Sequence, residues 1–372
     1  MFNYSFTETS LWLNTYCLLV YLTVIFFGTR RALINKPLTV KEKPLYLLIL
    51  GCFLLFLVSC FINADFFSYQ NYVKEFNVND SNYLGALDYV LLIVGKRYIL
   101  FRMVVWWGAL FLVLKTNKRL GLDNYIVVYC LFAMFILTFC YARATLAMSI
   151  YYFGYSFLCK PIEKHKTISV VLGLAIIVSS FFFHKSMAVL IALTPIILFP
   201  LNKKTIFLSL ILFPLLAGAV SSMFFSILDT QAIEDELIMG KMEGYSDRDY
   251  SNELNLRGFI LTWINYLSIY AIVFIELKQI VSSKKKIIPK EYVNLIKITV
   301  GVVFFATLLL FLDIPNTIFY YRILFMALIP ATLCFCYLYR KGFLRNWVFY
   351  SILFLRIGLQ LITLTYYVTS YM

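Results

Sequence analysis

Charged residues are scarce in this sequence. Only 14% of its 372 residues are Asp, Glu, Lys or Arg, whereas 62% are hydrophobic and 19% are aromatic. A soluble domain could not cover so much apolar side chain with so little polar surface. The composition therefore excludes a soluble globular protein and predicts an all-α, polytopic integral membrane bundle.

Recognisable catalytic and metal-binding motifs are missing as well. The sequence has no Walker-type phosphate loop, no GxSxG, no HExxH and no cysteine–histidine metal spacing, and none of its eight cysteines forms a CxxC pair. We therefore expect no metal and no cofactor, and cysteines that serve for packing or face lipid. Histidine occurs only twice: His165 lies in the charged segment KPIEKHK, and His184 lies between two apolar runs.

The net charge of +14 comes from short clusters of Lys and Arg between apolar runs. One alternate set of connecting segments holds 22 of the 33 Lys and Arg residues, and the other set holds 8. This asymmetry follows the positive-inside rule, which predicts that the first set is cytoplasmic and that both termini face outward. A membrane protein with this distribution has no need of a nucleic-acid partner to explain its charge.

We predict about twelve transmembrane helices in a single transmembrane domain, residues 1–372. The first apolar run lacks the basic residues and the cleavage site of a signal peptide, so we expect it to remain as a span. Residues 84–95 are too short to span and predict an interfacial or re-entrant piece. One larger outer loop, residues 225–257, carries eight acidic and three basic residues. The predicted spans are 11–28, 45–63, 98–114, 124–140, 144–158, 168–183, 187–201, 205–224, 258–275, 298–312, 317–338 and 346–365.

Several arginines lie in or beside apolar runs, where a charge at mid-helix costs about 2.5–3.5 kcal/mol even on permissive scales. Arg102 and Arg322 lie near the outer ends of their spans, and Arg143 begins a span on the same side. Snorkelling, or anchoring at the surface, is the alternative to a functional role for these three. Arg356 lies nearer mid-span, and pairing inside the bundle is its alternative. No carboxylate lies deep in any predicted span, so the arginines indicate an anionic ligand such as a lipid-borne pyrophosphate.

Two further groups are predicted on the outer side. Asp65, Tyr69 and Tyr72 share one face if their segment is helical, and a carboxylate beside aromatic rings suits a sugar. An aromatic belt at the membrane interface is the alternative for the tyrosines. His184, at an outer turn, could act as a general base, or could simply bond a carbonyl at a helix end.

The order of these short motifs resembles that of the EpsG-like family of Wzy-type polysaccharide polymerases. The matching segments are D…Y..Y after an early span, ARATLAMSI at the start of a span, FFHKSMAVLI, and YYRILF near the end. The sequence departs from the family pattern at Ala144, where Gln is common, and at DYVLLIVGKRY, where a glutamate-containing segment is common. The resemblance covers most of the chain.

The resemblance implies a metal-independent membrane glycosyltransferase that joins undecaprenyl-pyrophosphate-linked repeat units in O-antigen (lipopolysaccharide), capsule or exopolysaccharide synthesis. It would act at the outer face of the bacterial inner membrane, beside the flippase and chain-length regulator of its pathway. His184, Arg143 and Arg322 are the expected catalytic residues. The expected substrate-binding residues are Asp65, Tyr69, Tyr72, Arg257 and Arg102. A lipid-linked oligosaccharide flippase or other transporter, and an O-antigen ligase or membrane acyltransferase, remain alternatives.

Overall fold

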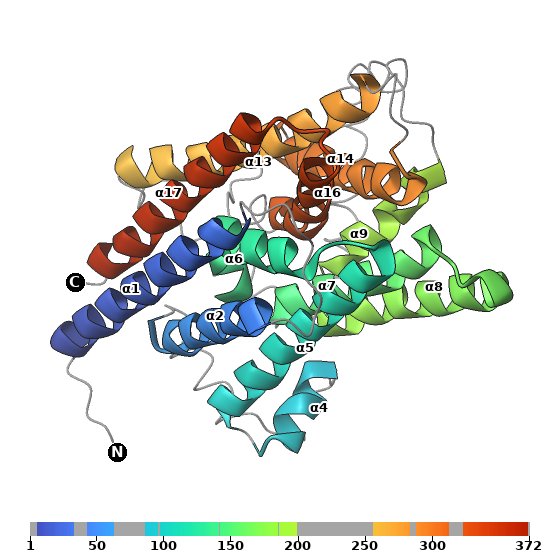
Figure 1. The fold of residues 1–372 in the computed structure, drawn as a ribbon. Coiled ribbons are helices and arrows are strands. Elements are labelled where there is room, and N and C mark those ends of the chain that lie inside the picture. The colour runs from blue at the N-terminus through green and yellow to red at the C-terminus, as the bar shows by residue number, and fades with distance from the viewer. Residues whose placement is uncertain are drawn as a thin grey trace. The chain divides into compact units, whose positions relative to one another are not determined.

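The computed structural model describes residues 6–32, 43–62, 86–95, 97–140, 142–184, 186–198, 256–282, 288–311 and 323–370. Within these ranges all regular structure is helical and no β-strand occurs (Figure 1). The predicted all-α class is therefore confirmed for the described part of the chain. The α-helices are α1 (Phe6–Ala32), α2 (Lys43–Ile62), α4 (Ala86–Ile93), α5 (Tyr98–Leu120), α6 (Asn124–Cys140), α7 (Ala142–Cys159), α8 (Lys166–Phe183), α9 (Met187–Leu193), α13 (Leu256–Ser282), α14 (Lys290–Phe311), α16 (Leu328–Arg340) and α17 (Asn346–Ser370). Two 3-10 helices, η2 (Glu163–His165) and η3 (Thr194–Leu198), adjoin them.

Three described helical stretches are long and apolar enough to cross a membrane: Ile99–Leu120, Glu163–Phe183 and Ile323–Arg340. The chain is therefore a candidate membrane protein on direct structural grounds. Shorter apolar helices occur at Lys43–Leu57, Asn124–Met134, Met187–Leu198 and Asn346–Ile362. The number of about twelve spans stays a prediction, since the predicted span 205–224 lies outside the described residues.

Two helices continue past the predicted ends of their spans, because helical structure extends beyond the apolar run. The span predicted to end at residue 114 continues to Leu120, where Gly121 adopts a left-handed conformation with φ of 74°. The N–H of Leu122 then bonds the carbonyl of Asn117 at 2.9 Å, which completes a Schellman motif. The span predicted to end at residue 275 continues to Ser282, because Glu, Leu, Lys and Gln are all good helix formers.

The chain forms two compact units: unit 1 contains residues 1–191 and 332–372, and unit 2 contains residues 192–331. In unit 1, α1 packs on α2, α5 on α7, and α7 on α8. Helix α6 contacts α2 and α17, and α17 also contacts α1.

The first part of helix α6 is completely enclosed in unit 1. Every residue from Tyr125 to Met134 is buried. Two consecutive carbonyls of this helix accept side-chain hydrogen bonds: Tyr21 Oη donates to Ala133 O at 2.7 Å, and Arg356 donates to Met134 O through Nε at 3.1 Å and Nη2 at 2.8 Å. Arg356, only 3% exposed, therefore pairs inside the bundle, and a backbone carbonyl is among its partners.

Helices α7 and α8 cross closely at two glycines. A Cβ atom on Gly154 would lie 2.8 Å from Gly173 O, and one on Gly173 would lie 2.9 Å from Gly154 O. Only glycine permits this approach of the two backbones. Because a short connection joins the end of α7 to the start of α8, the two helices run antiparallel.

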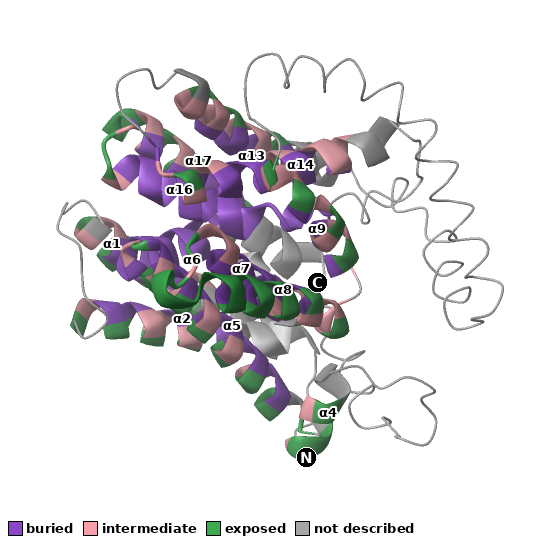
Figure 2. Cartoon of the chain, turned by 90° about the vertical axis from the view of Figure 1, so that its right-hand side faces the viewer, coloured by how far each residue is buried: buried purple, intermediate pink, exposed green. Residues whose placement is uncertain are grey.

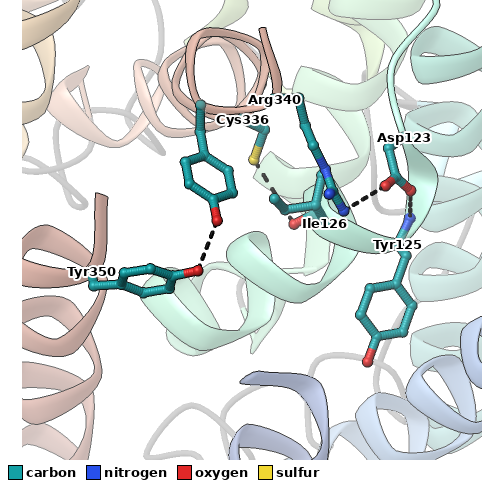
Figure 3. A network of polar contacts seen from close by, with 7 residues as sticks. Asp123, Tyr125, Ile126, Cys336, Arg340 and Tyr350 are labelled. Carbon is teal, nitrogen blue, oxygen red and sulfur yellow. Dashed lines mark hydrogen bonds and ion pairs between the residues drawn. The ribbon is translucent and has the colours of Figure 1, made fainter. Parts of the chain in front are cut away.

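A polar network joins α6, α16 and α17 (Figure 3). Arg340 Nη2 lies 2.8 Å from Asp123 Oδ2, and the backbone N–H of Tyr125 donates to Asp123 Oδ1 at 2.9 Å. Asp123 thus caps the start of α6 and pairs with the last residue of α16. The hydroxyls of Tyr339 and Tyr350 are hydrogen-bonded at 2.7 Å, which joins α16 to α17.

In unit 2, α13 packs on α14, and α14 packs on η3. Lys297 Nζ donates to Ile197 O at 2.9 Å, and the residue is 9% exposed. Glu276, predicted to begin an inner loop, is instead completely buried within α13.

Candidate functional site

The predicted site residues fall into three groups. His184 and Arg102 are described with their side chains, and Arg143 and Arg257 are described as members of helices α7 and α13. The remaining predicted residues, Asp65, Tyr69, Tyr72 and Arg322, lie outside the described residues. Nearly all of the acidic loop 225–257 lies outside them as well.

The glycine crossing fixes the levels of Arg143 and His184 along the helix pair. Arg143 precedes Gly154 by eleven residues, and His184 follows Gly173 by eleven residues. At a rise of 1.5 Å per residue, both lie about 16 Å from the crossing. Because α7 and α8 are antiparallel, both residues lie at the same end of the pair.

An apolar cluster brings the start of α5 to this same end. Phe101 and Leu146 belong to one buried cluster, and Phe183 packs against it. Phe101 adjoins Arg102, Leu146 follows Arg143 by three residues, and Phe183 adjoins His184. We call this end of unit 1 the Arg143 end. It gathers the backbones of three predicted site residues that are up to 82 positions apart in the chain.

His184 terminates α8. Its backbone is extended, with φ of −157° and ψ of 117°, while its N–H still bonds Ser180 O at 3.2 Å. Its own carbonyl accepts the N–H of Met187 at 2.9 Å, which starts the next helix. The partly buried imidazole is therefore held at a fixed corner between α8 and α9.

The hydrogen bond between Ser186 and His184 is compatible with two tautomers of the imidazole, which differ in their chemistry. Ser186 Oγ is hydrogen-bonded to His184 Nδ1. If Nδ1 donates this bond, the neutral ring carries its lone pair on Nε2, which can accept a proton. If Ser186 donates instead, Nε2 carries the hydrogen and acts as a donor. A role for His184 as a base thus requires the first tautomer.

Arg102, the fifth residue of α5, is buried and lies against aromatic rings. The residue is 3% exposed, and its guanidinium carbon lies 5.4 Å from the centroid of the Phe56 ring. Phe56 in turn stacks on Trp106 at 5.3 Å. Contact with an aromatic face offsets part of the cost of burying a guanidinium. Its assignment to substrate binding stays a prediction.

Arg143 and Arg257 share a position in their helices. Each is the second residue, in α7 and in α13 respectively. The first-turn N–H groups of a helix have no acceptor within it, and the helix dipole favours an anion there. An arginine at this position adds charge where a phosphate would be favoured.

Sequence reasoning missed several buried polar residues, and two of them are notable. Glu276 is completely buried in α13, and Gln360 in α17 is 3% exposed, with its Oε1 atom lacking a hydrogen-bond partner among the described residues. Gln360 follows Arg356 by one helical turn, so both lie on one face of α17. The spacing of Arg356 and Gln360 in the apolar run was the signal for this polar face. No comparable signal marked Glu276, because it adjoins a lysine-rich segment typical of a loop.

Comparisons of this chain with protein-family models, with curated proteins and with solved structures found no match.

Proposed function

We propose that the chain is a Wzy-type polysaccharide polymerase that joins undecaprenyl-pyrophosphate-linked repeat units. One observation carries this proposal: the helix packing of unit 1 gathers Arg102, Arg143 and His184 at the Arg143 end. Together with the motif order in the sequence, this favours a site that combines cations with a titratable imidazole. Such a site suits transfer from a pyrophosphate leaving group.

The proposed reaction has balanced atoms and charges. A hydroxyl oxygen of the acceptor repeat unit attacks the anomeric carbon of the growing chain, and the bond from that carbon to the pyrophosphate oxygen breaks. The hydroxyl proton passes to His184, and the bonding electrons leave with the undecaprenyl pyrophosphate. Arg143 and Arg322 stabilise the negative charge that develops on this leaving group.

The sugar-binding part of the proposal rests on residues outside the described ranges. Asp65 would accept hydrogen bonds from sugar hydroxyls, and Tyr69 and Tyr72 would stack on the sugar rings. Arg257 and Arg102 are additional substrate contacts. In this proposal the Arg143 end faces outward from the bacterial inner membrane, and the pathway's flippase and chain-length regulator work beside the enzyme.

Alanine substitutions test the proposal in a deletion strain that is complemented with each variant. We expect R143A, H184A and R322A each to reduce long-chain surface polysaccharide at least about 100-fold, because general-base and electrostatic groups commonly contribute that much. The matched control is H165A, since His165 is exposed in η2 at the opposite end of unit 1. Normal chain lengths on gels from all three variants, at normal expression, would contradict the proposed site.

A transporter is the second candidate, and Glu276 is the observation that favours it. Buried carboxylates within helices are typical of proton-coupled transport, and Lys297 in the adjoining α14 is also buried. The deletion phenotype separates the two functions. Loss of a polymerase leaves single repeat units on the cell surface, whereas loss of a flippase leaves none.

A further inference from the structure

The connection between α7 and α8 is strongly basic and lies at the end of unit 1 opposite to the Arg143 end. Residues 160–166, which we call the basic loop, contain three lysines and one glutamate, all of them exposed: Lys160, Glu163, Lys164 and Lys166. A surface that carries three cations beside one anion attracts anionic groups.

Hydrogen bonds to both neighbouring helices fix the backbone of the basic loop. Arg119, in the last turn of α5, donates to Lys160 O at 2.7 Å and to Ser156 Oγ at 3.0 Å. Its guanidinium carbon also lies 3.6 Å from the centroid of the Phe157 ring. On the other side, Ser169 Oγ accepts the N–H of Ile162 at 3.1 Å. The lysines therefore extend from a preorganised backbone, which lowers the entropic cost of binding.

An exposed apolar stripe begins beside the basic loop and follows α8. Its members are spaced by three or four residues, as on one face of a helix: Ile168, Val171, Ala175, Val178 and Phe182. Ile168 is 65% exposed and Phe182 is 52% exposed. Figure 2 shows exposed residues along α8.

We infer that the basic loop and the stripe of α8 together bind an anionic phospholipid. The phosphate group would lie among Lys160, Lys164 and Lys166, while an acyl chain would lie along the stripe. Charge complementarity selects this occupant, since a stripe without the cations would accept any lipid. Clusters of Lys and Arg at the ends of membrane helices attract anionic headgroups in this way.

Titration of the detergent-solubilised full chain with single lipids tests the inference. Native mass spectrometry would give the apparent Kd of the first bound phosphatidylglycerol and, separately, of phosphatidylcholine. We expect the wild-type chain to prefer phosphatidylglycerol at least ten-fold, and K160Q/K164Q/K166Q to lose this preference, because each lysine near an anionic headgroup contributes about a five-fold effect. The variant K160R/K164R/K166R should keep the preference, which separates loss of charge from loss of folding.

The matched control removes three exposed cations elsewhere in unit 1, in K43Q/K341Q/R345Q. It should keep the preference for phosphatidylglycerol. Equal losses in both glutamine variants would mean diffuse attraction to the whole basic surface and would overturn the inference. An unchanged preference in K160Q/K164Q/K166Q, or dimers in place of lipid-bound monomers, would also overturn it. Neither result bears on the polymerase proposal, because the basic loop is remote from Arg143 and His184.

Discussion

Two helical stretches of this protein are both long and apolar enough to cross a membrane, yet their surroundings differ sharply. In the stretch Glu163–Phe183, which contains α8, 22% of an apolar 18-residue window is buried within the structure, whereas in Ile323–Arg340, which contains α16, 94% is buried. The first packs one face against protein and leaves the other face exposed. The second is surrounded by protein. Apolarity therefore identifies a crossing helix without telling what covers it.

Side-chain chemistry reflects this difference. The apolar stripe of α8 is exposed, and the buried face of that helix includes Gly173 at the crossing with α7. Helix α16 buries polar Thr332 and both Cys334 and Cys336 completely. It also ends in the ion pair between Arg340 and Asp123. A helix that is enclosed on all sides can satisfy polar groups against protein on every face, whereas a partly exposed helix can do so only on its buried face.

The largest difference between the two stretches should appear at the acidic residues at their ends, namely Asp123, which pairs with the end of α16, and Glu163, which begins the other stretch. Removing Asp123 in D123A leaves Arg340 without its carboxylate and the start of α6 without its cap. The Asp123 side chain is 4% exposed, so we expect a loss of about 3–5 kcal/mol of unfolding free energy. The matched change E163A, at the exposed start of the other stretch, should cost less than about 0.5 kcal/mol. Steric trapping or unfolding in mixed dodecyl sulfate micelles measures both losses of unfolding free energy. Equal losses would contradict the difference in burial between the two stretches.

Replacing a leucine by alanine should also lower the unfolding free energy much more in α16 than in α8. Leu333 in α16 is fully buried, so L333A should leave a cavity and cost about 2–5 kcal/mol. Leu172 in α8 is 44% exposed, and L172A should cost less than about 1 kcal/mol. The same unfolding assay applies. A larger loss for L172A than for L333A would show that the surface of α8 is covered by protein.

The smallest predicted effect concerns the close approach of the α7 and α8 backbones at Gly154 and Gly173. G173A should destabilise the protein by about 1–3 kcal/mol, because the new Cβ would lie 2.9 Å from Gly154 O. Gly358 in α17 has no atom within 4 Å of an added Cβ, so G358A should stabilise by up to about 1 kcal/mol. Thermal unfolding of the purified chain measures both variants. A lower melting temperature for G173A and a higher one for G358A would support the close crossing of α7 and α8, whereas a higher melting temperature for both variants would contradict it.

Much of the fold could be predicted from the sequence, because apolar runs and their flanking charges determine helices in a membrane. The short piece predicted at residues 84–95 coincides with the eight-residue helix α4. The partner of Arg356 could not be predicted, since it is a backbone carbonyl of a helix 222 positions away. The burial of Glu276 was likewise missed, because burial depends on neighbouring helices and not on the local run of residues.

The candidate site, like the fold, could be predicted from the sequence only in part. The residue types at Arg143 and His184 could be predicted, since a charge and an imidazole stand out in apolar surroundings. Their common level depends on the contact between Gly154 and Gly173, which no local pattern reveals. Asp65, Tyr69, Tyr72 and Arg322 stay predictions outside the described residues.

The two side-chain bonds to α6 have a consequence for biosynthesis. Tyr21 on α1 and Arg356 on α17 bond neighbouring carbonyls of α6, and α1 also lies against α17 (Figure 1). Unit 1 is therefore built from two segments that are separated in the chain, and its second segment, residues 332–372, is synthesised only after residues 192–331. During translation residues 125–134 of α6 lack the cover of α17 until about 200 more residues have been made. Completion of this unit must therefore wait until α17 has been made, and a chain that terminates before α17 would leave this face of α6 uncovered.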